Sequence, residues 1–180
     1  MTYNQGEYLH TAIQSALSQT YENIEILISN NGSSDDTTNI VQSFLPNKKI
    51  TYLNYPKNES INLRANQAID LASGDFISWL YGDDYYLDEK IQTQIHAFNS
   101  LDKSYGVVYG PGYIDHVSDG KKVISSTLNY SGHCLEKFLA RWVKDGTINP
   151  ISPLVRRDCY NYHRPDNAIF TEGEVLYLHL

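Results

Sequence analysis

Two adjacent carboxylates follow an apolar segment near the middle of the chain. Residues 76–80 read Phe-Ile-Ser-Trp-Leu, and Gly82, Asp83 and Asp84 come after Tyr81. Carboxylate oxygens suit Mg²⁺ or Mn²⁺, and an ion held this way keeps positions open for substrate phosphates. Because neighbouring side chains of an extended strand point to opposite faces, one of the two, Asp83, is predicted as the metal ligand. The alternative is a pair of ordinary solvated turn residues.

A second polar loop follows another apolar segment. Residues 24–28 read Ile-Glu-Ile-Leu-Ile, and residues 29–36 consist of Ser, Asn, Gly and Asp alone. In open α/β sheets, ligands bind beyond the carboxyl ends of the strands. The loops at residues 30–36 and 81–86 are therefore predicted to lie together at one edge of a sheet.

The elements that position these loops alternate along the chain. Apolar residues recur at helical spacing over residues 7–20, 35–45, 63–72 and 87–98, and residues 24–28, 50–55 and 76–80 are typical of strands. Short links between alternating strands and helices predict an α/β sandwich with a mostly parallel central sheet. From residue 105 onward, shorter strands at 106–110, 121–125 and 152–157 accompany a helix at 134–143. The whole chain is predicted to be a single domain with halves at 1–104 and 105–180.

Composition excludes several classes of protein. The 180 residues are 41% hydrophobic and carry 14 basic against 21 acidic side chains, a net charge of -7. No basic surplus exists to grip nucleic acid phosphates, so no nucleic acid partner is expected, and an anionic substrate would need a metal ion. Cys134 and Cys159 lack the spacing of a zinc site or a disulfide framework and are predicted to be reduced thiols. The polar N-terminus and the lack of a long apolar run predict an intracellular chain.

Several segments, in the right order, resemble the family 2 glycosyltransferases, which are inverting enzymes with a glycosyltransferase A-type fold. The family opens with Pro-Thr-Tyr-Asn, continues into a helix and an Asp-Asp-Gly-Ser loop, and later ends a strand with Asp-Asp. The matching segments here are residues 2–9, 12–15, 19–25, 30–37 and 66–84. The resemblance implies a Rossmann-like nucleotide-diphospho-sugar transferase sandwich, with the donor site in residues 1–104 and a partial acceptor side in 105–180.

The resemblance also implies roles at the base end of the donor site. Thr2 and Tyr3 would line the nucleotide base pocket, and the loop at Asn30 and Asn31 would meet the base edge. Arg64 lies near a position that contacts base or phosphate in the family. The alternatives are a frayed terminus for Thr2 and Tyr3 and a solvated helix face for Arg64.

At the phosphate end, the resemblance gives the two carboxylates different roles. Asp83 would hold a Mg²⁺ or Mn²⁺ ion that bridges the diphosphate of a nucleotide-diphosphate-sugar, and Asp84 would support the donor sugar or the loop. Tyr81 replaces the first carboxylate of the family's Asp-x-Asp, and Asn30 and Asn31 replace two aspartates. An asparagine oxygen still accepts a hydrogen bond but brings no charge to strengthen it.

The catalytic base of the family is the Asp of a Glu-Asp pair that opens a late helix. Gly173 occupies that position here, so Glu172 and Glu174 are the candidates for the base and Asp166 is a more distant one. The alternative is that these acids only favour a helix start.

The resemblance predicts an enzyme that transfers a sugar with inversion to a saccharide or lipid-linked acceptor, in cell-surface polysaccharide biosynthesis. It would act in the cytoplasm, at the inner face of the membrane, with peripheral membrane association. The alternative is a catalytically silent relative that binds a sugar nucleotide or a protein partner. A nucleotidyltransferase is disfavoured because the sequence has no Gly-rich, basic phosphate loop.

Both ends of the chain interrupt the family pattern. Relatives have an apolar strand directly before Pro-Thr-Tyr-Asn, whereas Met1 stands here at the proline's position, and residues 175–180 stop within an apolar helical pattern. The resemblance implies a domain truncated at both ends. Unpaired strand edges would then lower its stability and promote self-association.

Overall fold

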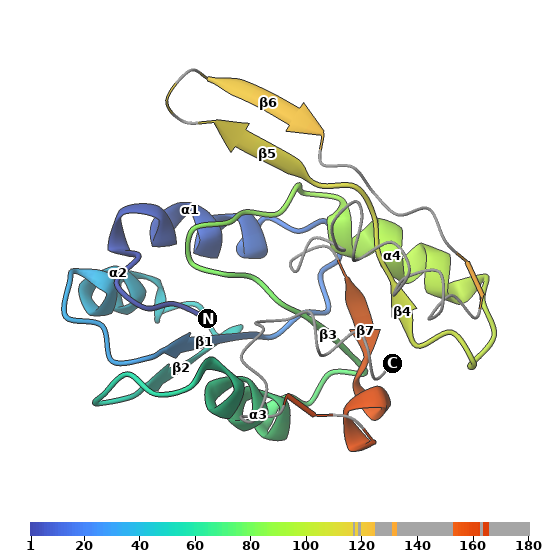
Figure 1. Cartoon of the computed structure of the whole chain (residues 1–180), viewed down its shortest axis with the longest axis horizontal. Helices are drawn as coiled ribbons and strands as arrows, with labels where there is room; N and C mark the ends of the chain where they lie inside the picture. Colours follow the sequence, from blue (N-terminus) through green and yellow to red (C-terminus); the bar gives the residue numbers. More distant parts are fainter. Residues whose placement is uncertain (117, 119, 125–130, 133–152, 163, 166–180) are drawn as a thin grey trace, which may run out of the picture.

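The computed structural model describes residues 1–116, 118, 120–124, 131–132, 153–162 and 164–165 (Figure 1). Helices and strands alternate through most of this part of the chain. The elements, in chain order, are α1 (Gly6–Leu17), β1 (Ile26–Asn30), α2 (Thr37–Phe44), β2 (Ile50–Asn54), α3 (Ile61–Leu71), β3 (Phe76–Ser78), α4 (Lys90–Asn99), β4 (Val107–Val108), β5 (Tyr113–His116), β6 (Lys121–Ile124), β7 (Leu154–Arg156) and the 3-10 helix η1 (Arg157–Asn161).

Strands β1 and β2 form a parallel pair, with Ile26 opposite Ile50 and Asn30 opposite Asn54. The strand predicted at residues 24–28 starts and ends two residues later than expected. Asn30 is therefore the last strand residue instead of the first residue of a loop, because its backbone oxygen accepts a hydrogen bond from the Tyr55 amide beside β2.

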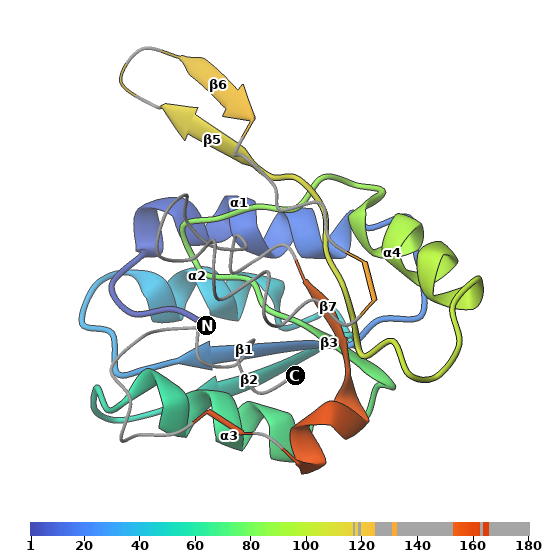
Figure 2. The same ribbon diagram turned by 45° about the vertical axis from the view of Figure 1, so that its right-hand side comes forward.

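A second sheet has the order β3-β7-β4, and β7 runs antiparallel to both of its neighbours. The predicted strand at residues 152–157 is confirmed as β7, which returns between β3 and β4 from the far end of the chain. Strands β5 and β6 form a hairpin that projects from the rest of the molecule (Figures 1 and 2). The helix predicted at 134–143, with Cys134, lies outside the described residues.

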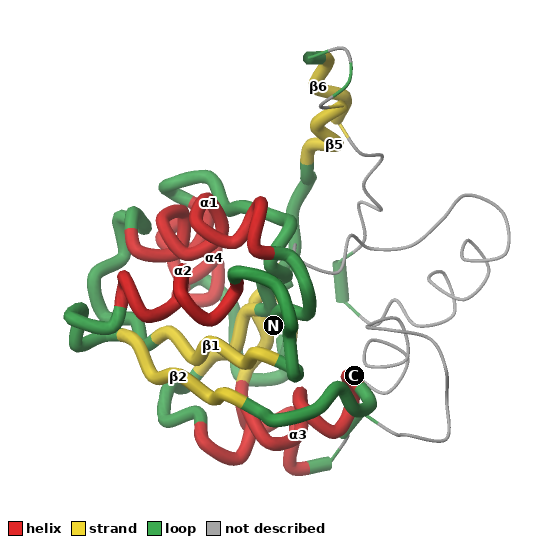
Figure 3. Tube along the Cα trace, turned by 90° about the vertical axis from the view of Figure 1, so that its left-hand side faces the viewer, coloured by secondary structure: helices red, strands yellow, loops and turns green. Residues whose placement is uncertain are grey.

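Helices cover both sides of the β1–β2 pair. Figure 3 shows α1 and α2 above it and α3 below it. On the upper side, Leu9 and Ile13 of α1 pack with Ile28 of β1 and Val41 of α2. These residues recur at helical or strand spacing, so burying them fixes which face of each helix meets the sheet. The α/β layers predicted from the sequence are thus present.

Two further apolar clusters surround the second sheet. Ile69 of α3 packs against Val155 of β7 and Tyr160 of η1. Ile91 and Phe98 of α4 pack on the other face of the sheet. Within the described ranges, no helix combines the length and the apolar character needed to cross a membrane.

Candidate functional site

The two predicted polar loops meet through the first residues of the chain. The Thr2 amide donates to the Ser29 carbonyl oxygen at 2.9 Å, and the Thr2 carbonyl accepts from the Asn31 amide at 2.9 Å. On the other side, the Met1 nitrogen donates to the Leu80 carbonyl oxygen at 2.7 Å. Residues 1 and 2 therefore connect the carboxyl end of β1 with the segment that leads to Asp83.

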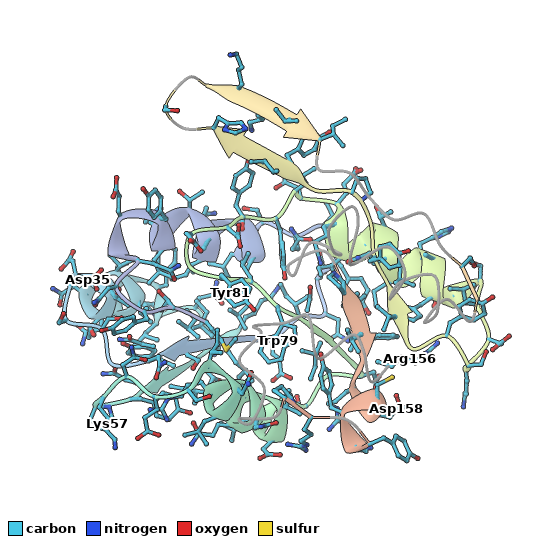
Figure 4. All side chains as sticks on the ribbon, in the orientation of Figure 1. Asp35, Lys57, Trp79, Tyr81, Arg156 and Asp158 are labelled. Carbon is cyan, nitrogen blue, oxygen red and sulfur yellow. The ribbon has the colours of Figure 1, made fainter. Side chains whose placement is uncertain are left out.

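Figure 4 shows how the labelled side chains are distributed around this junction. Asp35 and Lys57 lie at the end of the molecule toward which β1 and β2 point. Trp79 and Tyr81 lie near the centre, on the segment that follows β3. The candidate site thus extends from the loops after β1 and β2 to the turn after β3, as expected for a ligand at the carboxyl ends of strands.

Thr2 is anchored, and the alternative of a frayed terminus is wrong for this residue. Its side chain is 4% exposed, and its hydroxyl oxygen is buried without a hydrogen-bond partner among the described residues. A Cβ at Gly82 would lie 2.6 Å from that oxygen, so the turn after β3 packs directly on Thr2. Tyr3 is 44% exposed and lies beside this contact in sequence. Its predicted role at the base stays a prediction.

Asn30 is fully buried, and its side chain hydrogen-bonds to other residues of the chain. Its amide nitrogen donates to the Tyr52 hydroxyl at 3.0 Å and to Asn54 Oδ1 at 3.1 Å, and its Oδ1 accepts from the Ser33 amide at 3.1 Å. These bonds join β1, β2 and the loop after β1. An ionised aspartate here would have no donor for Asn54 Oδ1, whereas the amide of Asn30 both donates and accepts.

Asn31, Arg64 and residues 55–59 form a second group, the Asn31–Arg64 cluster. Arg64 Nε donates to Asn31 Oδ1 at 2.8 Å and its NH2 donates to the Lys57 carbonyl at 3.0 Å. The guanidinium carbon lies 3.7 Å from the centre of the Tyr55 ring. Because Arg64 is only 5% exposed, the alternative of a solvated helix face is wrong. The Asn31 amide nitrogen donates to the Glu59 carbonyl at 2.8 Å, so both loops are held together.

Gly32 allows the two loops to approach. Its φ is +76°, and a Cβ at this position would lie 2.3 Å from the Lys57 carbonyl carbon. Only glycine adopts this conformation without strain and also leaves space for the Lys57 backbone. The glycine is therefore required for the contact that brings residues 57–59 to Asn31.

A turn over residues 81–84, the acidic turn, follows β3. The Asp84 amide donates to the Tyr81 carbonyl at 3.2 Å. Asp83 is exposed and Asp84 is partly buried. Burial raises the pKa of the Asp84 carboxyl, and the neighbouring negative charge of Asp83 raises it further. This local excess of negative charge favours the binding of a cation.

The acidic turn fits a divalent ion that is bound together with phosphate. No group of three or more acidic, His or Cys side chains that could hold a metal exists among the described residues. Mg²⁺ is commonly held by one or two carboxylates plus substrate phosphates, so the two aspartates suffice for that mode of binding. A metal site made by protein side chains alone is not supported here.

A partly buried lysine, Lys90, lies beside the same strand. Lys90 Nζ of α4 donates to Ser78 Oγ at 2.7 Å and to Gln94 Oε1 at 2.9 Å, and it lies 4.3 Å from the centre of the Tyr86 ring. Burial lowers the pKa of Lys90 to about 7. The Tyr86 hydroxyl in turn donates to the Trp79 carbonyl. This polar network fixes the segment that carries the acidic turn.

The predicted catalytic acids lie elsewhere in the sequence. Glu172, Glu174 and Asp166, like the Gly173 position, fall outside the described residues. Their role as candidates for the base stays a prediction.

Sequence reasoning missed the loop after β2. Tyr55, Lys57 and Glu59 take part in the Asn31–Arg64 cluster, but no motif singled them out. The signal was available, because β2 is parallel to β1 and carboxyl ends of adjacent parallel strands coincide. A polar segment directly after β2 had to lie beside the loop after β1.

Comparison with known proteins gives one family. The model of the family described as Glycosyl transferase family 2 matches residues 1–131. An uncharacterized glycosyltransferase of Rickettsia prowazekii (strain Madrid E) is 39% identical over 135 residues, which cover 74% of this chain and 42% of the relative.

Two relatives carry names that describe a reaction. The UDP-Glc:alpha-D-GlcNAc-diphosphoundecaprenol beta-1,3-glucosyltransferase WfaP of Escherichia coli is 38% identical over 52% of this chain and 37% of its own length. The GalNAc(5)-diNAcBac-PP-undecaprenol beta-1,3-glucosyltransferase of Campylobacter jejuni is 32% identical over 76% of this chain and 42% of its own length. The chain spans less than half the length of these curated relatives.

Solved structures show the same fold. The crystal structure of S. aureus TarS 1–349 matches with a TM-score of 0.66 and 17% identity, over 98% of this chain and 52% of that one. The mannosyltransferase PcManGT from Pyrobaculum calidifontis, in complex with GDP-Man and Mn²⁺, matches with a TM-score of 0.53 and 16% identity, over 59% of this chain and 32% of that one. The predicted α/β nucleotide-diphospho-sugar transferase fold is confirmed.

Proposed function

The chain belongs to glycosyl transferase family 2, and we propose that it carries the donor-binding half of an inverting sugar transferase that uses a nucleotide-diphosphate-sugar. The observation that carries this proposal is that two unlike regions lie together beyond the carboxyl ends of β1, β2 and β3. The Asn31–Arg64 cluster presents a rigid polar surface, and the acidic turn presents two adjacent carboxylates, one exposed and one partly buried. A nucleotide-diphosphate-sugar needs both, because its base is read by fixed polar groups and its diphosphate requires a cation beside acids.

At the base end, Tyr3 and the backbone of the loop at Asn31 contact the nucleotide in our proposal. Tyr3 is exposed next to the anchored Thr2, and Asn31 is held in place by four hydrogen bonds, to Asn58, Glu59 and Arg64. Arg64 acts by orienting Asn31, and Asn30 acts by holding the loop. Fixed geometry of this kind lowers the entropic cost of binding.

At the phosphate end, Asp83 holds the Mg²⁺ or Mn²⁺ and Asp84 supports the turn. The ion would neutralise the charge that develops on the departing diphosphate. Asp83 is the more exposed carboxylate, whereas Asp84 is partly buried, which supports this division of roles. The Mn²⁺ in the complex of the Pyrobaculum mannosyltransferase is consistent with it.

Inversion requires a carboxylate that removes the proton from the acceptor hydroxyl while that oxygen attacks the sugar. We assign this role to Glu172 or Glu174, with Asp166 next. They belong to the half of the chain, residues 105–180, that we assign to the acceptor side. The base end and phosphate end both lie within residues 1–104, the half that we assign to the donor.

The acceptor that we propose is a saccharide linked to a lipid diphosphate. The names of the Escherichia coli and Campylobacter jejuni relatives describe undecaprenol-linked acceptors. Such an acceptor stays in the bilayer, so the enzyme would act at the inner face of the cytoplasmic membrane, in cell-surface polysaccharide synthesis. Peripheral association with this membrane belongs to the same proposal.

A second candidate function is a silent module that binds a sugar nucleotide without turnover. It is favoured by the residues that stand where the family resemblance leads us to expect acids, which are Asn30, Asn31, Tyr81 and Gly173. Because Asn30 is fully committed to bonds within the chain, one of these changes has a structural reason.

Sugar-nucleotide hydrolysis separates the two functions. We expect the chain to release UDP slowly from UDP-glucose with Mn²⁺ present, and to lose this activity with EDTA. Calorimetry on the same samples measures binding. Metal-dependent binding without any release of UDP would support the silent module, and no binding of UDP-glucose or GDP-mannose at all would contradict both.

A further inference from the structure

The β5–β6 hairpin is a sheet of its own among the described strands. Its strands pair antiparallel, and every residue of both strands is exposed. Figures 1 and 2 show the hairpin on the far side of α1 from the β1–β2 pair. A two-stranded hairpin is at best marginally stable by itself, so its contacts with the rest of the chain fix its place.

The side chains of the hairpin divide between two faces. Residues that pair across the strands lie on the same face, and successive residues of one strand alternate between the faces. One face, the inner hairpin face, therefore carries Tyr113, Asp115, Lys122 and Ile124. The opposite one, the outer hairpin face, carries Ile114, His116, Lys121 and Val123.

Tyr85 connects the inner hairpin face to the segment that follows the acidic turn. Its hydroxyl donates to Asp115 Oδ2 at 3.1 Å and accepts from Lys122 Nζ at 2.8 Å. The same ammonium lies 3.4 Å from Asp115 Oδ2 and 5.3 Å from the centre of the Tyr85 ring. Because Tyr85 directly follows Asp84 in the chain, the inner hairpin face borders the acidic turn.

These contacts leave much of the inner hairpin face open. Tyr113 is 51% exposed and Ile124 is 64% exposed. The side chain of Lys122 stays 56% exposed in spite of its bonds. An open aromatic ring, an aliphatic side chain and a pair of opposite charges therefore lie on one surface. Small-molecule sites have this composition, with apolar and aromatic walls and a few polar groups that fix the orientation of the ligand.

The same set of groups suits a sugar. A tyrosine ring has a flat apolar face, which matches the C–H face of a pyranose, and a hydroxyl at its tip. A sugar hydroxyl both donates and accepts, and Lys122 and Asp115 offer a donor and an acceptor side by side. Tyr113 and Lys122 are diagonal neighbours across the strands, about 8 Å apart, so one sugar ring can reach both.

The position of the hairpin also suits an acceptor. In the proposed function, the donor diphosphate lies at Asp83, and the acceptor hydroxyl has to be held beside the donor sugar in a fixed orientation. The hairpin belongs to residues 105–180, the half that we assign to the acceptor. Tyr85 ties it to the chain two residues after Asp83.

We infer that the inner hairpin face binds the saccharide of the acceptor, with Tyr113 against the sugar ring and Lys122 and Asp115 at its hydroxyls. The inference rests on the proposed function and extends it by naming the acceptor surface. A lipid surface is a poorer occupant, because the opposite charges of Lys122 and Asp115 balance and so do not select anionic lipids. The inner face is also the one that is turned toward Tyr85.

The test is a calorimetric titration of the full chain with two soluble acceptor fragments. They are α-linked GlcNAc diphosphate and α-linked GalNAc diphosphate, each with a hexyl chain, because the names of the relatives contain these sugars. We expect saturable one-to-one binding of at least one fragment when UDP and Mn²⁺ are present. Hexyl diphosphate, which lacks the sugar, is the matched control and should bind at least tenfold more weakly. This comparison uses the parent chain and does not depend on how a variant folds.

The alternation along each strand supplies matched variants. Tyr113 and Ile114 are neighbours with the same exposed fraction, 51%, but they lie on opposite faces. Tyr113→Ala should weaken binding of the fragment at least tenfold, whereas Ile114→Ala should change it less than twofold. Lys122→Met and Lys121→Met form a second pair across the same two faces. We expect a loss of about tenfold for Lys122→Met and less than twofold for Lys121→Met.

The affinity for UDP in Mn²⁺, measured on the same samples, separates this inference from the proposed function. It should be equal in the parent chain and the four variants. Absence of UDP binding would contradict the proposed function, whereas absence of fragment binding to the parent chain would overturn the inference whether or not UDP binds.

Three further results would assign the hairpin to another partner and overturn the inference. Equal binding of hexyl diphosphate, or equal losses in Tyr113→Ala and Ile114→Ala, would indicate a contact with lipid that does not read the sugar. A dimer of the parent chain that Tyr113→Ala dissociates, measured by sedimentation, would assign the inner hairpin face to a second copy of the chain.

Discussion

The two ends of the candidate site differ in how their charged side chains are compensated. In the Asn31–Arg64 cluster, the buried guanidinium has hydrogen-bond acceptors and an aromatic ring around it. At the acidic turn, Asp84 is partly buried beside a second carboxylate, and the partly buried Lys90 nearby has its pKa lowered to about 7. One region is complete within the chain. The other has a charge that a metal ion bound with the substrate would balance.

The two regions therefore have different roles: the Asn31–Arg64 cluster positions the loops, and the acidic turn binds the metal ion. A saturated cluster contributes rigidity, because every lost bond leaves a buried polar group unpaired. A turn with excess negative charge contributes little to stability but gains strongly when a cation arrives. Mutations in the first region should therefore lower stability, and mutations in the second should lower metal-dependent affinity.

The largest effect is expected for Arg64→Ala. It leaves Asn31 Oδ1 and the Lys57 carbonyl without this donor and removes the stacking on Tyr55, so the free energy of unfolding should fall by about 3 kcal/mol. Urea unfolding measures this loss. Arg157→Ala, at an exposed arginine, is the control and should change stability by less than about 0.5 kcal/mol. An equal effect of both changes would contradict the contrast between the regions.

Substitution of the candidate bases on the acceptor side should change only the rate of sugar transfer. Glu172→Gln or Glu174→Gln should lower the rate of sugar transfer roughly 100-fold, because a glutamine cannot remove the acceptor proton. Nucleotide affinity and stability should stay at the parent values. If both variants transfer sugar at the parent rate, Asp166 becomes the candidate for the base.

Gly32→Ala tests whether the two loops must touch. The Cβ would lie 2.3 Å from the Lys57 backbone at a positive φ, so we expect a loss of about 2 kcal/mol in stability. Gly120→Ala is a matched control, since Gly120 also has a positive φ but, its chain neighbours aside, no atom of the described residues within 4 Å. It should cost about 1 kcal/mol. A smaller loss for Gly32→Ala than for the control would show that the loops move apart freely.

The lowered pKa of Lys90 predicts that the stability of the chain depends on pH, through the segment that carries the acidic turn. Its pKa is about 7 in the folded chain, against an ordinary value of 10.5. Between these values the unfolded chain binds more protons, so stability should rise with pH, by at most about 1.4 kcal/mol per pH unit. Lys90→Met should remove this slope. Melting curves from pH 7 to 10 measure it, and an unchanged slope in the variant would contradict the assignment.

Much of the fold follows from local patterns. Helical spacing of residues such as Leu9 and Ile13, and polar loops after apolar strands, are properties of short segments, so α1, β1, β2 and the acidic turn were predictable. The direction of β7 was not, since it depends on where a distant segment returns. Neither the burial of Arg64 nor the committed amide of Asn30 has a local signature, because both result from contacts between loops.

The central claim is that the acidic turn binds a nucleotide diphosphate through a divalent ion held by Asp83. Its most direct test is a calorimetric titration of UDP in Mn²⁺ and in EDTA, on the parent chain, Asp83→Asn and the exposed control Asp88→Asn. We expect metal-dependent binding that weakens at least tenfold, about 1.4 kcal/mol, in Asp83→Asn and stays unchanged in Asp88→Asn. Equal UDP affinity with and without EDTA, or an unchanged affinity in Asp83→Asn, would contradict it.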